Sequence, residues 1–196
     1  DHPNSLDCLD SIQDGFLHIN QQYYTKKGRN GIIRPSKGCD VWTHDDDDDH
    51  SDNKELFFQA IQAASQSDVV VFVGGLNLTL ENESLDRPDI RLPTIQVQLL
   101  HNISHVNPNI VLVLFHGGMV GLDQVLDFVP TGVSAGYPGP YAGTVIPKML
   151  YGLQYGDYGW GKTPVTWYHD GITDELNMLD FDMGRHPGRT YRYHTS

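Results

Sequence analysis

The hydrophobic pattern in the middle of the chain alternates between helix-like and strand-like spacing. Apolar residues recur at helical spacing over residues 53–66 and again over 95–106, which predicts two amphipathic helices. Each stretch is followed by a continuous apolar run, at 69–73 and at 110–115. Short β-branched runs of this kind are typical of strands buried on both faces. We therefore expect parallel strands, the first of them central in its sheet.

The alternation continues toward the C-terminus with shorter elements. We expect a short helix near 121–128, a strand near 131–137, a helix over 141–151 and late strands at 164–168 and 190–193. This order predicts an α/β fold, a mostly parallel β-sheet sandwiched between helices, with a ligand crevice at the carboxyl ends of the strands. The loops expected at that edge are 75–92, 116–121 and 136–141.

The N-terminal part of the chain follows a different pattern. Residues 1–52 show no sustained periodicity and carry several Gly and Pro turn signals. We therefore expect an irregular N-terminal segment, followed by the α/β sandwich domain over 53–196. Cys8 and Cys39 are the two cysteines, and they either pair and pin this segment or both remain free thiols.

Composition narrows the classes of partner. Against 25 Asp and Glu there are only 13 Lys and Arg, a formal net charge of −12 over 196 residues. This charge repels phosphate backbones and anionic membrane surfaces, so we expect no nucleic-acid partner. The apolar runs are far shorter than the ~20 residues that span a bilayer, so we expect no membrane insertion. Ten His would gain charge on acidification, which suits an acidic compartment.

Other features favour a secretory origin. Three N-glycosylation sequons begin at Asn77, Asn82 and Asn102. Together with the option of a disulfide, they favour a secreted location, extracellular or lumenal. The chain opens on Asp1 without an initiator Met or an apolar signal region, which predicts a processed product or a fragment.

The loop 75–92 is unusually long and polar for a connection that leaves a buried strand, and such loops are often functional. Glu81 and Glu83 are two residues apart, so in an extended loop both side chains point the same way. A close pair of carboxylates raises one pKa toward general-acid use. Asp86 and Arg87 offer a charge partner or a clamp for sugar hydroxyls. Taken alone, these side chains are better explained as a solvated surface, because surface carboxylates are the rule.

Two further side chains are candidates for ligand contact. His116 follows a buried strand and is placed either to hydrogen-bond a ligand or to act as a satisfied structural histidine. Trp160 is the best candidate for stacking on a sugar ring. The glycines after the strands form no phosphate-binding loop, and the sequence implies no metal or organic cofactor.

Several stretches also match one family in the same order along the chain. They are Asp68-Val-Val-Val-Phe-Val-Gly-Gly-Leu, Glu81-x-Glu83-x-x-Asp86-Arg87, Leu92-Pro93-x-x-Gln96, Gly136-Tyr137-Pro138-Gly139, Pro164-Val-Thr-Trp-Tyr168 and Pro187-Gly188-Arg189-Thr190-Tyr191-Arg192. These stretches resemble glycoside hydrolase family 3, most closely the carboxyl-terminal α/β sandwich domain of its β-xylosidase and α-arabinofuranosidase branch. The resemblance covers most of the chain.

The resemblance implies a retaining β-glycosidase that hydrolyses terminal β-linked sugars such as xylosides or glucosides. A preceding (β/α)8 barrel, on another chain or a removed segment, would supply the nucleophilic Asp, and this domain the acid/base Glu. Because retaining chemistry needs two carboxylates about 5 Å apart, we expect this chain alone to be inactive. Glu81 is the first candidate for the acid/base residue and Glu83 the second.

Departures from the family pattern support an alternative. The family usually has Asp-Gln where this chain has Asn77-Leu78, and Gly where it has Ser84. The sequons at Asn77 and Asn82 bracket Glu81, and a glycan on either would crowd the crevice. The alternative is a catalytically lapsed, secreted glycoprotein module with a structural or carbohydrate-binding role, in an extracellular assembly that contains copies of itself.

Overall fold

The structure of the chain is a computed structural model that describes residues 9–41, 51–153, 161–177 and 179–194. The chain forms two compact units, each made of two stretches of sequence. The helical unit consists of Asp1–Pro35 and Pro138–Lys162, and the sheet unit consists of Ser36–Tyr137 and Thr163–Ser196.

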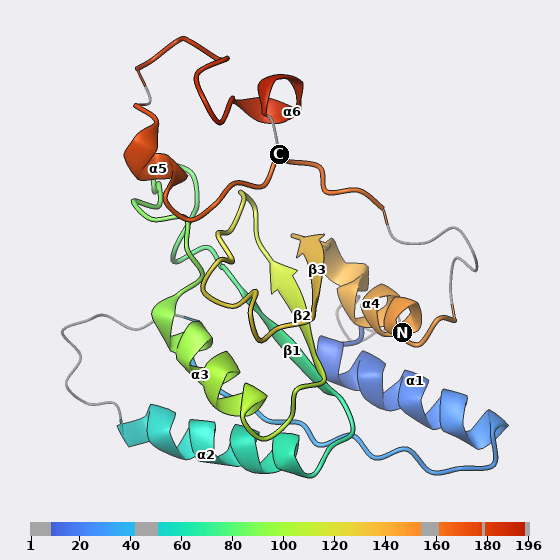
Figure 1. Ribbon diagram of the computed structural model, residues 1–196. Coiled ribbons are helices and arrows are strands. Elements are labelled where there is room, and N and C mark those ends of the chain that lie inside the picture. Colours follow the sequence, from blue (N-terminus) through green and yellow to red (C-terminus); the bar gives the residue numbers. More distant parts are fainter. Residues whose placement is uncertain (1–8, 42–50, 154–160, 178, 195–196) are drawn as a thin grey trace. The chain divides into compact units, whose positions relative to one another are not determined.

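The sheet unit is built on three parallel strands in the order β1–β2–β3 (Figure 1). They are β1 (Val70–Gly75), β2 (Ile110–Phe115) and β3 (Thr131–Gly136), close to the predicted positions. The expectation that β1 is central is wrong among the described residues, because β2 pairs with both neighbours. The apolar run of β1 misled the prediction, since its Val73 is exposed. The α/β fold with a parallel sheet is confirmed.

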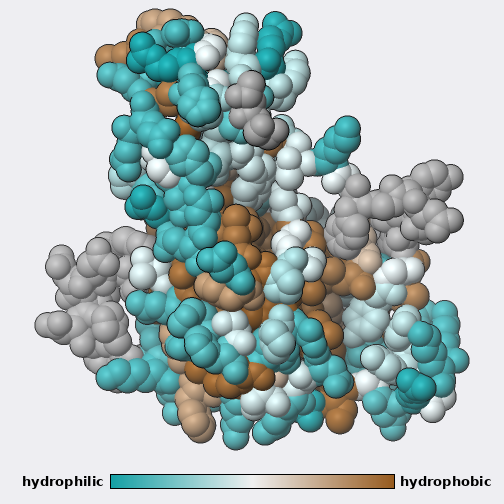
Figure 2. Space-filling model, in the orientation of Figure 1, coloured by the Kyte–Doolittle hydropathy of each residue, from teal (hydrophilic) through white to brown (hydrophobic). Residues whose placement is uncertain are grey.

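Two helices of the sheet unit cover its hydrophobic core, α2 (Ser51–Ser65) and α3 (Thr94–Ser104), and both agree with the predicted periodicity. Helix α3 packs against α2 and β1. Figure 2 shows hydrophobic residues gathered in the middle of the view, where Figure 1 draws the sheet. The buried core consists of Ala60, Ala64, Leu76, Leu92, Leu99, Leu100, Ile103, Ile110, Leu112, Leu114, Val120, Val125 and Val129.

The helical unit pairs α1 (Ile12–Lys26) with α4 (Ala142–Leu150), which follows the short 3-10 helix η1 (Gly139–Tyr141). Helix α1 lies in the segment for which the sequence predicted no regular element. Residues 27–41, by contrast, form no helix or strand. None of the helices in the described ranges is both long and apolar enough to cross a membrane.

The buried face of α1 explains why its periodicity was missed. It includes Gly15 and Asn20, which a search for apolar residues does not count. Gly15 allows a close approach, since a Cβ there would lie 1.6 Å from the carbonyl oxygen of Gly143. Asn20 is satisfied by the hydroxyl of Tyr151, which donates to its Oδ1 at 2.7 Å. Close packing and a buried hydrogen bond thus hold this helix pair together.

Three of the smaller predicted elements are wrong. Residues 190–193 form a short helix, α6 (Thr190–Tyr193), rather than a strand, and Thr190 has a φ of 60°, which no strand accommodates. Residues 164–168 form no strand, and residues 121–128 form turns rather than a helix. A series of turns can bury Val125 and Val129 at the same spacing as a helix would, so the pattern does not separate the two. One more short helix, α5 (Ile172–Glu175), precedes α6.

Leu100 provides a test of the core. Leu100→Ala removes a side chain with no exposed area and should lower the free energy of unfolding by about 2–5 kcal/mol. The exposed Leu126 is a matched control, and Leu126→Ala should change the free energy of unfolding by less than about 0.5 kcal/mol. Urea denaturation followed by circular dichroism measures both, and equal losses for the two variants would contradict this packing.

Candidate functional site

The loops at the carboxyl ends of the three strands meet at the carboxylate of Glu81. Its Oε1 accepts hydrogen bonds from the backbone N–H of Gly117 at 2.6 Å and from the hydroxyl of Tyr137 at 2.8 Å. Its Oε2 accepts from Nε of Arg87 at 3.1 Å. Gly117 lies just beyond β2, and Tyr137 directly follows β3. One carboxylate therefore joins the three loops that the sequence placed at this edge.

Gln96 fixes the point at which the loop 75–92 leaves the sheet. Its buried side chain pairs with both backbone groups of Gly75: Oε1 accepts from the N–H and Nε2 donates to the C=O, each at 2.8 Å. The same Nε2 also donates to the carbonyl of Val41 at 2.7 Å. Gly75 has a φ of 119°, a backbone conformation that residues other than glycine rarely adopt. The loop thus begins from a rigid position.

The next part of the loop ends in a tight hairpin that carries Glu83. The backbones of Asn82 and Leu85 exchange hydrogen bonds of 3.2 and 3.0 Å, which leaves Glu83 and Ser84 at the tip, both exposed. Ser84 has a φ of 66°, a left-handed conformation that favours Gly. The Gly usual in the resembling family therefore has a plain structural reason at this position.

Arg87 returns the loop to the sheet unit and is almost fully engaged within the protein. Besides contacting Glu81, its Nη2 donates to the carbonyl of Met119 at 2.8 Å and its Nη1 to that of Ile90 at 3.4 Å. The structure thus places Arg87 as a support for Glu81 rather than as a free clamp. The neighbouring Asp86 is exposed and lies outside this set of contacts.

The electrostatics of Glu81 differ from the expectation. Desolvation would raise its pKa, but the hydrogen bond from Tyr137, the N–H of Gly117, the positive charge of Arg87 and the N–H of Gly118 together outweigh it. The pKa of Glu81 is therefore lowered. The rise expected for one member of a close carboxylate pair does not occur at Glu81, because its carboxylate is surrounded by donors.

His116 has a structural position. It is 2% exposed, with Nδ1 2.7 Å from the carbonyl oxygen of Gly118 and Nε2 2.8 Å from the hydroxyl of Ser134. Its ring also makes a T-shaped, edge-to-face contact with that of Trp167. With both ring nitrogens engaged, His116 links β3 to the loop that carries Gly117. Trp160, the other expected ligand contact, lies outside the described residues.

The three sequons differ in their surroundings. The half-buried Asn77 accepts hydrogen bonds through Oδ1 from the N–H and the hydroxyl of Thr79. Asn82 donates through Nδ2 to the carbonyl of Leu78 at 2.7 Å. Asn102 is exposed on helix α3. Asn82 and Asn102 are thus both exposed, but the Nδ2 of Asn82, the atom to which a glycan would attach, is already bonded to Leu78.

The cysteine pairing stays a prediction, because Cys8 lies outside the described residues. Cys39 is half-buried. Burial, reinforced by the negative charge of Asp40 and only partly offset by Lys37, raises the pKa of the Cys39 thiol to about 11. Cys39 is therefore protonated near neutral pH and a poor nucleophile.

Sequence reasoning missed two contributors to the site, Tyr137 and Gly117. Tyr137 was part of the motif Gly136-Tyr137-Pro138-Gly139, in a loop expected at this edge, so position was the available signal. Gly117 must lack a side chain, since a Cβ there would lie 2.8 Å from Oε1 of Glu81 and 2.9 Å from Cε2 of Tyr137. Both roles depend on contacts between loops that are far apart in sequence.

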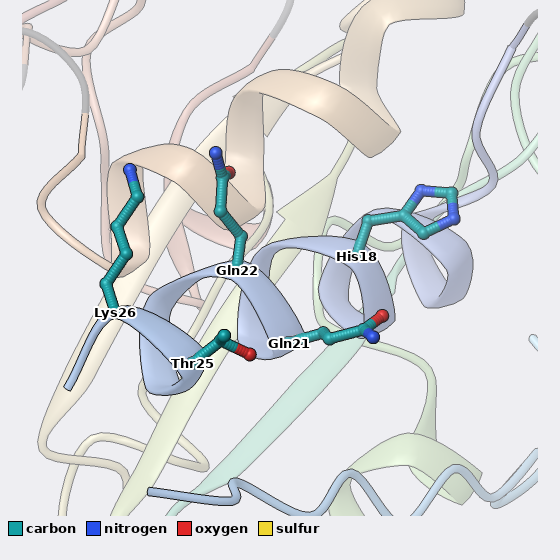
Figure 3. Close-up of a pocket in the computed structure, with 5 residues that line it drawn as sticks. All are labelled: His18, Gln21, Gln22, Thr25 and Lys26. Atoms are coloured by element: carbon teal, nitrogen blue, oxygen red, sulfur yellow. The ribbon is translucent and has the colours of Figure 1, made fainter. Parts of the chain in front are cut away.

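The surface hollow shown in Figure 3 lies on a single helix, away from the residues around Glu81 in the sequence. Its lining side chains all project from helix α1, and they are His18, Gln21, Gln22, Thr25 and Lys26. A hollow along one exposed helix brings no groups together for chemistry. Nor do the described residues contain a group of three His, Cys, Asp or Glu side chains that could hold a metal ion.

Comparison with known proteins gives a consistent result. The model of the glycosyl hydrolase family 3 C-terminal domain matches residues 5–194. A probable exo-1,4-beta-xylosidase of Aspergillus flavus is 34% identical over 167 residues, which cover 83% of this chain and 20% of that protein. A beta-xylosidase/alpha-L-arabinofuranosidase of Medicago sativa subsp. varia is 34% identical over 143 residues, 69% of this chain and 18% of that protein.

A solved structure agrees with these relatives. A GH3 exo-beta-xylosidase in complex with a xylobiose aziridine activity-based probe superimposes with a TM-score of 0.73 at 25% identity, over 96% of this chain and 23% of that one. The chain spans about a fifth of the length of the curated relatives it matches.

The lowered pKa of Glu81 predicts a pH-dependent contribution to stability. The ionised Glu81 stabilises the folded state above the ordinary carboxyl pKa of about 4.3, and this stabilisation is lost as the pH falls through the lower folded-state value. The difference in the free energy of unfolding between wild type and Glu81→Gln should thus be largest and constant above about pH 5.5. It should shrink at acid pH. Urea unfolding between about pH 3 and 7 measures it. Glu83→Gln is the control and should follow wild type; a difference for Glu81→Gln that does not vary with pH would contradict the assignment.

Proposed function

This chain belongs to glycosyl hydrolase family 3, whose C-terminal domain it matches, and we propose that it supplies the proton-donating carboxylate of a retaining β-glycosidase. The substrate class is a terminal β-linked sugar, with xylosides first. The relatives named as xylosidases and the xylobiose-derived probe bound to one of them support this choice. The single observation that carries the proposal is the loop 75–92, which presents Glu83 at its tip and anchors Glu81 below it.

The contacts favour Glu83 as the acid/base residue and Glu81 as a positioning residue. A general acid must hold a proton at working pH and exchange it with the substrate. Glu81 has a lowered pKa and both of its oxygens are occupied by donors of the protein. Glu83 is exposed at the hairpin tip, so its carboxyl is accessible to a glycosidic oxygen.

The proposed reaction needs a second carboxylate from outside this chain. A (β/α)8 barrel, on the same longer polypeptide or on another chain, would carry an Asp about 5 Å from Glu83 across the scissile bond. That Asp attacks the anomeric carbon while Glu83 protonates the leaving oxygen, which yields a glycosyl-enzyme. Glu83, now a carboxylate, then takes a proton from water as the water oxygen attacks the anomeric carbon. This step releases the sugar and returns both carboxyl groups to their initial protonation states.

A second candidate function rests on the sequon Asn82-Glu83-Ser84, which contains the proposed acid itself. A glycan on Asn82 would stand next to Glu83 and block access to it. In that case the fold would serve as a catalytically lapsed, secreted glycoprotein module, with a structural or carbohydrate-binding role in an extracellular assembly of its own copies. We place either form in a secretory or acidic lumenal compartment, for which the sequons and the ten His are the support.

Kinetics of the enzyme that contains this chain together with its barrel test the acid/base role. Glu83→Gln should lower kcat/KM for xylobiose by about 10²- to 10⁴-fold, because the leaving sugar then departs without a proton. The glycosylation rate with an aryl β-xyloside whose phenol is acidic should fall much less, because that leaving group needs no proton. Glu83→Gln should also remove the limb of the pH–rate profile that reports the acid.

Glu81→Gln is the matched control for this experiment. As a change to a positioning residue it should lower kcat/KM for both substrates by a similar factor and leave the shape of the pH–rate profile intact. If Glu81→Gln instead shows the leaving-group dependence and Glu83→Gln does not, the roles of the two residues are exchanged. Unchanged turnover in both variants would reject the proposal and favour the lapsed module.

Glycopeptide mass spectrometry of the secreted protein provides a separate prediction. Occupancy should be highest at the exposed Asn102, and Asn82 should be unmodified in active enzyme because a glycan there would cover Glu83. Full occupancy of Asn82 would instead favour the lapsed module. Absence of glycans at all three sites would contradict the secretory location.

A further inference from the structure

Tyr137 is oriented in an unusual way for a tyrosine. Tyrosines generally bury the ring and leave the hydroxyl in water or at a polar edge. The hydroxyl of Tyr137 instead donates to Glu81 at 2.8 Å, while the residue as a whole remains 49% exposed. An aromatic ring that is held at its polar end and remains partly exposed is suited to contact a ligand.

The backbone also holds this ring in place. Pairing of Ser134 with Leu114 and of Gly136 with Phe115 leaves Ala135 as an extra residue in β3, a bulge that redirects the end of the strand. The residue after Tyr137 is a proline, which restricts the backbone of Tyr137 to extended conformations. The ring is therefore largely ordered before any ligand arrives, so binding to it loses little conformational entropy.

One edge of the ring packs against the backbone of Gly117. Gly117 lies so close that a Cβ there would come within 2.9 Å of Cε2 of Tyr137, and Gly118 follows it. The loop next to the ring therefore contributes backbone and no side chains at these two positions. Desolvation, the hydrogen bond to Glu81 and the charge of Glu81 raise the pKa of Tyr137 to about 12, so the phenol stays neutral and keeps donating to Glu81.

We propose that Tyr137 is a stacking platform for the pyranose ring of the substrate, at the same edge of the sheet as Glu81 and Glu83. The C–H face of a pyranose is apolar and slightly positive, and it complements the negative face of an aromatic ring. The phenol oxygen is already used by Glu81, so the ring rather than the hydroxyl meets the sugar. This inference rests on the proposed function for its ligand class.

Titration of the full chain with methyl β-D-xylopyranoside, followed by ligand-observed NMR, tests the platform without any hydrolysis. Tyr137→Ala should raise Kd by about 3- to 10-fold, the range of an aromatic contact. Tyr137→Phe loses the bond to Glu81 but keeps the ring, so it should bind within about 2-fold of wild type, and Tyr137→Trp should restore the affinity lost in Tyr137→Ala. Tyr191→Ala is the matched control, because Tyr191 is 84% exposed on α6, and it should leave Kd unchanged.

Several outcomes would overturn the platform. These are a wild-type chain that binds no sugar, a Tyr137→Ala chain that binds like wild type, and equal losses in Tyr137→Ala and Tyr137→Phe, which would trace the effect to the hydroxyl. Binding of the sugar to the chain requires no proton transfer. Failure of the acid/base role would therefore appear in turnover, and failure of the platform in this Kd.

In the barrel-containing enzyme the same variants separate binding from positioning. Both Tyr137→Ala and Tyr137→Phe remove the hydroxyl that donates to Glu81, so both should show the same change in kcat from the loss of this hydrogen bond. A rise in KM of about 3- to 10-fold should occur only in Tyr137→Ala. If the barrel instead covers the ring, KM will be equal in the two variants, and the platform is rejected.

Discussion

The carboxylate of Glu81 is the contact on which the arrangement of the three loops depends. It gathers a backbone N–H from the loop after β2, a hydroxyl from the residue after β3 and a guanidinium from its own loop. Parallel strands bring their carboxyl ends to one edge but do not fix the loops that leave them. A single half-buried, ionised acceptor with three donors does so, because hydrogen bonds to a charged acceptor are stronger than those between neutral groups.

The backbone segments around Glu81 are themselves fixed by two buried side chains of the sheet unit. Gln96 on α3 pairs with both backbone groups of Gly75, where the loop begins. His116 bridges Ser134 and the carbonyl of Gly118, next to the donor Gly117. Both side chains are buried and hydrogen-bonded, which makes them costly to displace. Precision at the crevice therefore comes from buried polar groups below it, while the hydrophobic core positions only the strands.

Two glutamates two residues apart have been given different environments. Glu81 lies among donors and remains charged, whereas Glu83 is held at the tip of a hairpin in which Ser84 adopts a left-handed conformation. The two side chains thus have different surroundings: the Glu81 carboxylate is fixed by three donors, and the Glu83 carboxyl is accessible at the tip. The proposed hydrolysis would add a second carboxylate from outside this chain.

The sequence by itself determined the strands β1 to β3, the helices α2 and α3, the family and the three loops at the carboxyl ends of the strands. These follow from local periodicity and from ordered motifs, which the printed residues contain in full. The tertiary structure alone decided that β2 is central, that α1 forms around Gly15 and Asn20, and that residues 190–193 are helical. It also decided that Glu81 accepts hydrogen bonds from Gly117, Tyr137 and Arg87. The physical reason is common to all of these: each depends on a partner distant in sequence, such as Gly117 for Glu81 or Tyr151 for Asn20, and no local pattern encodes such a partner.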